Sequence, residues 1–135
     1  MTATLNYVVY SAILTWMSYI VGSTVRNKLW TLKGYMIGMG NRDDRDTVAP
    51  PTTLSRRVDR AATNTIESFI TFAALALTAH AAGLDNEQVA MGAMIYFWAR
   101  VGYLLLYYFG VPYVRTLVWF VSVWGQIMII KVLLQ

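Results

Sequence analysis

Cysteine is absent from this 135-residue sequence, and histidine occurs only once, at His80. A chain without cysteine has no disulfide and no thiol nucleophile of its own. A single histidine excludes a bis-histidine haem bundle and any His-rich metal site, so we expect no metal cofactor. Charge is also scarce: 13% of the residues are charged and 57% are hydrophobic, whereas soluble domains carry about 25% charged residues. This composition indicates that most of the protein surface faces lipid.

The formal net charge of +4 comes mainly from one segment. Eight of the eleven basic residues lie between Arg26 and Arg60, and four aspartates are interleaved with them. The segment offers no aromatic-plus-basic platform on which nucleic-acid bases could stack, so we expect no nucleic-acid partner. A basic loop between apolar helices instead sets the orientation of a membrane protein.

Four apolar segments have about the length that a membrane-spanning helix needs. Pro50–Pro51 cannot lie inside a helix, and Thr52 or Thr53 can cap the helix that follows. Gly83 is a suitable residue after the end of that helix, and Gly110–Pro112 separates the last two segments. The sequence therefore predicts an all-α, integral membrane four-helix bundle in a single domain, residues 1–135. The expected helices cover approximately residues 5–25, 54–82, 87–109 and 113–134, with a loop over residues 26–53.

The distribution of basic residues predicts the topology. Met1–Asn6 contains no Lys or Arg, so we do not expect a cleavable signal peptide there. The loop over residues 26–53 is rich in arginine, whereas the turn over residues 83–86 has no basic residue. By the positive-inside rule, the loop is expected in the cytoplasm and the turn on the opposite side, together with both termini.

A polar stripe runs along the second helix with spacings of three or four residues, which place its members on one helical face. The polar stripe consists of Arg57, Arg60, Asn64, Glu67 and Thr71. On the third helix, Arg100 lies deep in an apolar segment and shares a face with three tyrosines, Tyr96, Tyr103 and Tyr107. Polar groups at such depth must face a protein interior or a wet cavity.

Two interpretations of these residues stay open. In the structural one, Glu67 and Arg100 pair with each other and Asn64 joins two helices. In the functional one, they line a site for a charged small molecule. One ion pair would leave Arg57, Arg60 and Arg115 without partners, and such an excess of guanidinium groups suits an anionic ligand. Tyr96 and Tyr108 are more typical of packing or of the membrane interface than of ligand binding.

Two sequence motifs resemble the MAPEG family, the membrane-associated proteins in eicosanoid and glutathione metabolism. They are RRVDRAATNTIE, with the spacing Arg60-x3-Asn64-x2-Glu67, and ARVGYLLLYYFGVPYVRTLVW, with Arg100-x2-Tyr103-x3-Tyr107 followed by Arg115. The segment GNRDD before the second helix is similar to the bacterial branch of the family, for which the resemblance implies an inner-membrane location. Ser68, Tyr103 and Thr63 differ from the eicosanoid-producing members, so the resemblance leaves the electrophile open.

The resemblance implies a homotrimer with a site at each subunit interface, in which glutathione is the co-substrate and membrane lipids surround the protein. Its implied glutathione-binding residues are Arg60, Asn64, Glu67, Arg100, Tyr103, Tyr107, Arg57 and, across the interface, Arg26. The residue matched to thiolate stabilisation, and hence to catalysis, is Arg115.

These patterns and the resemblance leave two functions open and argue against a third. The first is a membrane-bound glutathione transferase or peroxidase in which the glutathione thiolate attacks an apolar electrophile or lipid. The second is a non-catalytic, lipid-binding or accessory subunit of a larger membrane complex. A small multidrug transporter would need an embedded carboxylate in the first helix, and residues 5–25 contain none.

Overall fold

The computed structural model describes residues 1–28, 31–32 and 50–135. The described residues form four helices and no strands, as the sequence predicted: α1 (Ala3–Asn27), α3 (Thr53–Ala81), α4 (Glu87–Phe109) and α5 (Pro112–Leu133). These bounds lie within two residues of the ranges expected from the sequence. The segment GNRDD and most of the predicted basic loop lie outside the described residues.

Local capping signals explain where the helices begin and end. The Thr52 hydroxyl oxygen accepts a hydrogen bond from the backbone N–H of Ser55 at 3.1 Å and so caps the start of α3. The Asn86 side chain caps α4 in the same way. At the other end of α4, Gly110 has a φ of +75°, a conformation that glycine adopts without steric cost. Pro112 then opens α5, at a position where its missing N–H costs nothing.

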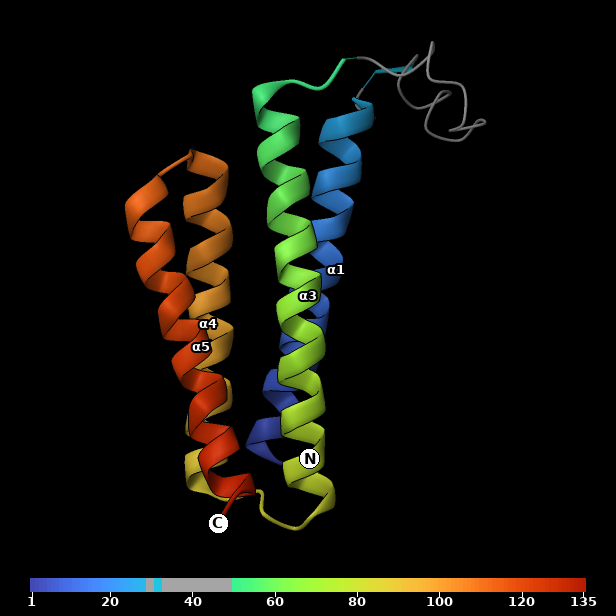
Figure 1. Cartoon of the computed structure of the whole chain (residues 1–135). Coiled ribbons are helices and arrows are strands. Elements are labelled where there is room, and N and C mark those ends of the chain that lie inside the picture. Colours follow the sequence, from blue (N-terminus) through green and yellow to red (C-terminus); the bar gives the residue numbers. More distant parts are fainter. Residues whose placement is uncertain (29–30, 33–49) are drawn as a thin grey trace.

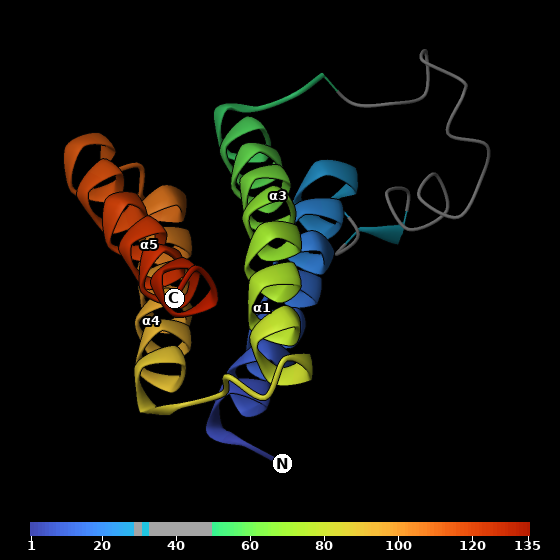
Figure 2. The same cartoon turned by 60° about the horizontal axis from the view of Figure 1, so that its bottom comes forward.

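The helices alternate in direction and form two adjacent pairs, α1 with α3 and α4 with α5 (Figures 1 and 2). Both termini and the turn between α3 and α4 lie at one end of the bundle, which we call the terminal end (Figure 1). The start of α3 and the turn between α4 and α5 lie at the opposite end, here called the loop end.

The packed core lies toward the terminal end. Phe72 of α3 stacks on Tyr96 of α4, with ring centroids 3.9 Å apart, and both side chains are fully buried. The Tyr96 hydroxyl also hydrogen-bonds the Ser68 hydroxyl at 3.2 Å. Tyr96 is therefore a packing residue, the more common role for a tyrosine in such a position. Gly92 and Gly125 allow the backbones of α4 and α5 to touch, because a Cβ at Gly125 would lie 2.6 Å from the carbonyl oxygen of Gly92.

The terminal end also holds a small polar cluster. The Thr4 hydroxyl donates a hydrogen bond to Asp85 at 2.5 Å, and the Nδ1 atom of His80 lies 3.0 Å from the other carboxylate oxygen. His80 is thus a contact residue between the end of α3 and the following turn. This cluster joins the start of α1 to the end of α3.

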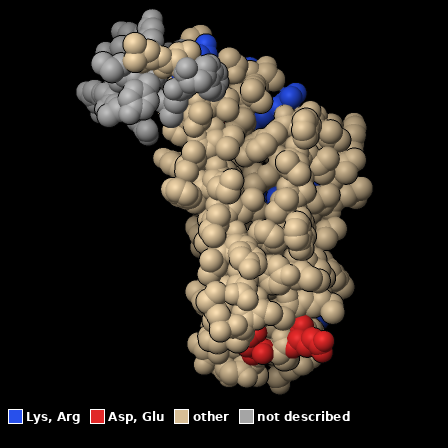
Figure 3. Space-filling model, turned by 180° about the vertical axis from the view of Figure 1, so that it is seen from behind, with Lys and Arg blue, Asp and Glu red and all other residues tan. Residues whose placement is uncertain are grey.

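The outer surface suits a lipid environment. Among the described helices, α1, α4 and α5 are each long and apolar enough to cross a membrane. On the face in Figure 3, basic side chains gather toward the loop end and acidic ones at the terminal end. Helix α3 is not among these three, and its first half carries the charged and polar residues of the polar stripe. Its 29 residues nevertheless run beside α1 for most of the length of that helix (Figure 1).

Candidate binding site between the two helix pairs

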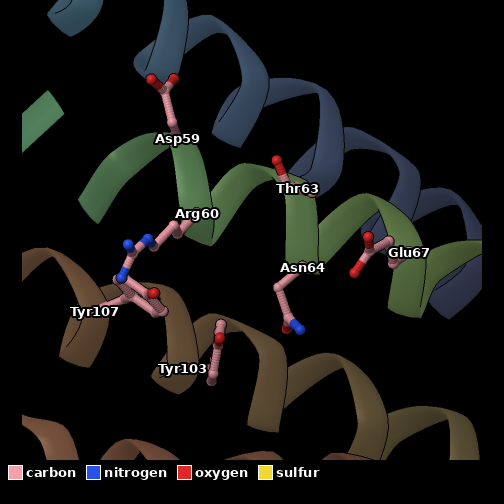
Figure 4. A pocket seen from close by; sticks show the side chains of 7 residues that line it. All are labelled: Asp59, Arg60, Thr63, Asn64, Glu67, Tyr103 and Tyr107. Atoms are coloured by element: carbon pink, nitrogen blue, oxygen red, sulfur yellow. The ribbon is translucent and has the colours of Figure 1, made fainter. Parts of the chain in front are cut away.

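The polar stripe of α3 borders a cavity of about 360 Å³ near the middle and loop end of the bundle. Figure 4 shows Arg60 and Asn64 pointing from α3 toward α4, which contributes two tyrosines, whereas Asp59 points toward α1. We call this space the Asn64 cavity, and its lining residues are Asp59, Arg60, Thr63, Asn64, Glu67, Tyr103 and Tyr107. Five of the residues predicted from the sequence therefore meet in one place.

Arg100 does not line the Asn64 cavity but hydrogen-bonds a residue that does, Asn64. Its side chain is 1% exposed, and its Nη2 atom donates hydrogen bonds to the Asn64 side-chain oxygen at 2.9 Å and to the Thr65 hydroxyl at 3.2 Å. The predicted pairing of Arg100 with Glu67 is wrong, because no such ion pair occurs among the described residues. Asn64 does join α3 to α4, as the structural interpretation expected.

Arg100 is only partly satisfied by these contacts. Its guanidinium lies over the Tyr103 ring, 4.4 Å from the centroid, which is a favourable cation–π geometry. Within the described part of the chain, its Nε and Nη1 atoms have no hydrogen-bond partner. Because Nη2 occupies the oxygen of Asn64, the amide N–H groups of Asn64 remain available to the cavity. Arg100 thus lies outside the cavity lining and orients a residue that belongs to it.

Tyr103 and Tyr107 extend the lining of the site along α4 toward the loop end. The Tyr103 and Tyr107 rings meet edge to face, with centroids 5.5 Å apart. The Arg115 guanidinium of α5 lies over the Tyr107 ring, 4.3 Å from its centroid. This stacking holds the charge of Arg115 in place, and Arg115 forms no ion pair with any of the described residues. Arg115 therefore lies next to the Asn64 cavity, although it does not line that cavity itself.

A second space of about 260 Å³ continues from the Asn64 cavity, with which it shares Arg60 and Tyr107. We call it the arginine cleft, and it is lined by Thr53, Arg56, Arg57, Arg60, Tyr107 and Arg115. The sequence analysis missed Arg56 as a member of the site. Arg56 does not belong to the polar stripe, whose members are three or four residues apart. It nevertheless lines the same cleft as its neighbour Arg57.

On the other side of the Asn64 cavity, a mainly apolar groove of about 450 Å³ runs between α3 and α5. It shares Asn64 and Glu67 with the cavity and continues past Trp119 and Val123 toward the terminal end. The Thr71 hydroxyl donates a hydrogen bond to the Gln126 side-chain oxygen at 2.9 Å across this α3–α5 groove. Gln126 is likewise a site residue that was not predicted from the sequence.

Arg26 lies apart from this constellation within the chain. Its guanidinium forms an ion pair with Asp59 at 3.7 Å and borders a hollow of about 210 Å³ between α1 and α3, which shares Asp59 and Thr63 with the Asn64 cavity. Asp59 lies on α3 directly before Arg60, and its carboxylate faces the opposite way (Figure 4). The structure therefore does not bring Arg26 together with Asn64 and Glu67 in one subunit.

The described residues contain no group of three or more His, Cys, Asp or Glu side chains that could hold a metal ion. Chemically, the site offers guanidinium and amide donors, phenol groups and two carboxylates, that of Glu67 and that of Asp59, which is paired with Arg26. Such a set can hold a small zwitterionic or anionic molecule at both its negative and its positive groups.

The model of the MAPEG family matches residues 4–134, nearly the whole chain. Neither the curated proteins nor the solved structures give a significant match.

Proposed function

Because this chain belongs to the MAPEG family, an all-helical family of membrane proteins that includes glutathione transferases, we propose that it is a membrane-bound glutathione transferase or peroxidase. The observation that carries the proposal is the Asn64 cavity itself. It joins Arg60, Asn64 and Glu67 from α3 to two tyrosines of α4, and Arg115 lies over one of those tyrosines.

Glutathione is a tripeptide with two carboxylates, one ammonium group and one thiol, and the cavity together with the adjacent Arg115 offers a partner for each kind of group. The Arg60 guanidinium and the Asn64 amide can donate to carboxylate or peptide oxygens, and the Glu67 carboxylate can accept from the ammonium group. The phenol groups of Tyr103 and Tyr107 can act as donors or acceptors toward the peptide. Arg100 contributes indirectly by fixing the Asn64 amide.

Arg115 is the residue that we assign to the thiol. A free thiol has a pKa of about 8.5, so most of it is protonated at neutral pH. A guanidinium at hydrogen-bond distance favours the charged thiolate and lowers that pKa. Stacking on Tyr107 holds Arg115 in place at the boundary of the Asn64 cavity and the arginine cleft. The protein therefore needs no cysteine of its own.

The two reactions use the same thiolate. In the transferase reaction, sulfur bonds to an electrophilic carbon, and the leaving group departs with the bonding electrons. In the peroxidase reaction, the sulfur attacks the terminal oxygen of a hydroperoxide, the O–O bond breaks and a sulfenic acid forms. The departing alkoxide takes a proton from water and leaves as the alcohol. A second glutathione then reduces the sulfenic acid to the disulfide and water. An apolar electrophile or a lipid would reach the thiolate from the bilayer along the α3–α5 groove.

The exposure of Glu67 supports the proposed homotrimer. Glu67 is exposed on the single chain, although it lies more than three turns into α3, where contact with lipid is costly. A neighbouring copy packed on this face would cover it, and Arg26 of that copy could reach the site. We further propose a bacterial inner-membrane location, with the loop end in the cytoplasm where glutathione is available. Native mass spectrometry in mild detergent should find a trimer, and a stable monomer would remove the interface site.

The function is tested by separating glutathione binding from thiolate formation. Asn64→Ala or Glu67→Ala should weaken glutathione binding in calorimetric titration by about 1–3 kcal/mol, because a charged hydrogen bond is lost. Arg115→Ala should retain most of the binding but lose the ultraviolet absorbance of the bound thiolate. Its turnover should fall through kcat rather than through KM alone.

Two controls make the Arg115 test specific. Arg115→Lys keeps the charge and loses the planar fork, so partial activity is expected. Lys131→Ala removes a positive charge near the opposite end of α5, where it lies over Trp124, and should change neither readout. If wild-type protein binds no glutathione, or if Arg115→Ala forms thiolate normally, the proposed enzyme function fails and a non-catalytic accessory role explains the fold better.

A further inference from the structure

The polar stripe of α3 continues past the Asn64 cavity. Its last member, Thr71, lies one turn after Glu67 and lines the α3–α5 groove instead of the cavity. There the Thr71 hydroxyl lies 2.9 Å from the side-chain oxygen of Gln126 on α5. The other groove residues from α5 are aliphatic or aromatic, and they are Trp119, Val123, Ile127 and Ile130. Gln126 is therefore an amide in an otherwise apolar wall of the groove, and the glutathione binding proposed above does not use it.

Gln126 also lies deep in α5, one of the helices long and apolar enough to cross a membrane. It follows Arg115 by eleven residues, which is about three turns and about 16 Å along the helix axis. Because three turns return a helix to nearly the same face, Gln126 and Arg115 lie on nearly the same side of α5. Polar side chains at such depth are costly next to lipid and are candidates for function by default.

Thr71 cannot occupy the whole amide of Gln126. The Thr71 hydroxyl is also 2.9 Å from the Ser68 carbonyl oxygen, and its single proton serves one of these two acceptors at a time. If it donates to Gln126, it engages neither N–H of the amide. If it donates to Ser68, the amide can turn and donate one N–H to the hydroxyl oxygen. No other described residue hydrogen-bonds the Gln126 side chain, so at least one N–H donor is left for a ligand in the groove.

The groove is continuous with the site of the proposed reaction. It shares Asn64 and Glu67 with the Asn64 cavity, and its volume of about 450 Å³ is within the usual range for small-molecule sites. A plain aliphatic chain suits the apolar wall but gives the Gln126 amide no group to which it can donate. A chain that carries an oxygen acceptor level with Gln126 suits both the wall and the amide.

We propose that Gln126 selects electrophiles that carry a neutral hydrogen-bond acceptor, such as a keto oxygen, part-way along an aliphatic chain. This selection rests on the proposed function, because the reacting carbon of the electrophile must lie at the glutathione sulfur beside Arg115. The acceptor then lies on the order of 16 Å from that carbon, the rise between Arg115 and Gln126. The spacing of two residues on one helix thus fixes where along the chain the oxygen must be.

The test uses long-chain alkenals of equal length, each with one keto group at a different carbon of the chain. The glutathione thiolate bonds to the β-carbon of the alkenal, the electrons of the double bond move toward the conjugated carbonyl, and the α-carbon takes a proton from water. Mass spectrometry of the adduct gives kcat/KM for each isomer. One keto position should be preferred about three- to tenfold over the others, the effect of one hydrogen bond between neutral groups.

Two matched variants locate the preference. Gln126→Leu keeps an apolar wall and should abolish the preference among the keto isomers. Because the preference is a ratio within one sample, a smaller folded fraction does not change it. Gln88→Leu is the control: Gln88 also joins two helices, by donating from Nε2 to the Met128 carbonyl oxygen at 3.4 Å, but it does not line the groove. This variant should keep the full preference.

A binding measurement makes the role of Gln126 testable apart from turnover. Stearate and stearates with one mid-chain keto group are offered in equal amounts to the protein in mild detergent, and native mass spectrometry measures what is retained. Wild-type protein should retain one keto form about three- to tenfold over stearate, and Gln126→Leu should retain both equally. Failure of the wild type to conjugate chlorodinitrobenzene or any alkenal counts against the proposed enzyme function alone.

Three results overturn the selection by Gln126. They are equal kcat/KM for all keto isomers, equal retention of keto and plain stearate by the wild type, and a preference that survives in Gln126→Leu. Equal values in the wild type would mean that a plain lipid chain or a neighbouring subunit fills the groove, and that Thr71 and Gln126 only join α3 to α5.

Discussion

Replacement of Arg100 by methionine should weaken glutathione binding while changing the stability of the fold little. Two opposing effects act on stability: hydrogen bonds are lost, and a buried charge is removed. The variant loses the hydrogen bonds to Asn64 and Thr65, and a hydrogen bond to a charged group contributes about 1.5–3 kcal/mol. It also removes a buried guanidinium group, whose Nε and Nη1 atoms have no hydrogen-bond partner among the described residues. Replacement of a buried charge by an apolar side chain of similar size can be neutral or stabilising by about 1–4 kcal/mol. The net change in the free energy of unfolding should therefore stay within about 2 kcal/mol.

Glutathione binding should respond more strongly than stability. The Asn64 side-chain oxygen loses its donor, so the amide is free to rotate and no longer presents its N–H groups to the cavity. Thr65 is less affected, because its hydroxyl also donates to the Ala61 carbonyl oxygen at 2.7 Å. Loss of one oriented hydrogen bond to a charged ligand should reduce the binding free energy by about 1–2 kcal/mol. The dissociation constant for glutathione should therefore rise roughly 5- to 30-fold.

The assay is calorimetric titration with glutathione, paired with thermal unfolding in the same detergent. Arg100→Lys is the matched control: it keeps a charge but lacks the fork that reaches Asn64, so it should bind as weakly as Arg100→Met. Adding Asn64→Ala to Arg100→Met should cause little further loss, because residues that act as a unit are not additive. Glutathione affinity unchanged in a stably folded Arg100→Met variant would refute the orienting role of Arg100.

Three further predictions concern the frame of the bundle. Gly125→Leu should lower the free energy of unfolding by about 1–3 kcal/mol or more, because its side chain would meet the α4 backbone; Gly102→Ala, whose Cβ would make an ordinary 3.6 Å contact, should change the unfolding temperature little. Burial works to raise the pKa of Asp85, but hydrogen bonds to the threonines that begin α1 and to His80 outweigh it and lower the pKa. The Asp85 carboxylate therefore contributes its full stabilisation above about pH 4, the ordinary aspartate range, and loses it as pH falls through the lowered pKa. In the Asp85→Asn variant, the unfolding temperature should therefore fall less between neutral and acid pH than it does in the wild type. Cysteines introduced for labelling at Asp85 and at Asp44, which lies outside the described residues, should react from opposite sides of the membrane, and labelling of both from one side would contradict the topology.

The number and bounds of the helices were predictable because local chemistry sets them. Apolar runs of membrane-spanning length, the Pro50–Pro51 break and the turns at Gly83 and Gly110 need no knowledge of tertiary contacts. The polar stripe of α3 was equally predictable, since the pitch of a helix alone puts residues three and four apart on one face. For the same reason Arg60, Asn64 and Glu67 could be grouped in advance.

Which side chains meet between helices depended on the rotation and vertical register of each helix, and sequence spacing within one helix carries no information on these. Arg100 could have reached Glu67 on the same face of α3, yet the register places it against Asn64 and Thr65. Arg26 is directed to Asp59 on the far side of α3, and Arg57 is fixed by contact with Gly110. These pairings follow from close packing, in which the contact of Gly92 with Gly125 and the stacking of Phe72 on Tyr96 set how α4 sits against its neighbours. The sequence by itself determined four helices and their polar face, and only the packing of the helices decided which arginine binds which partner.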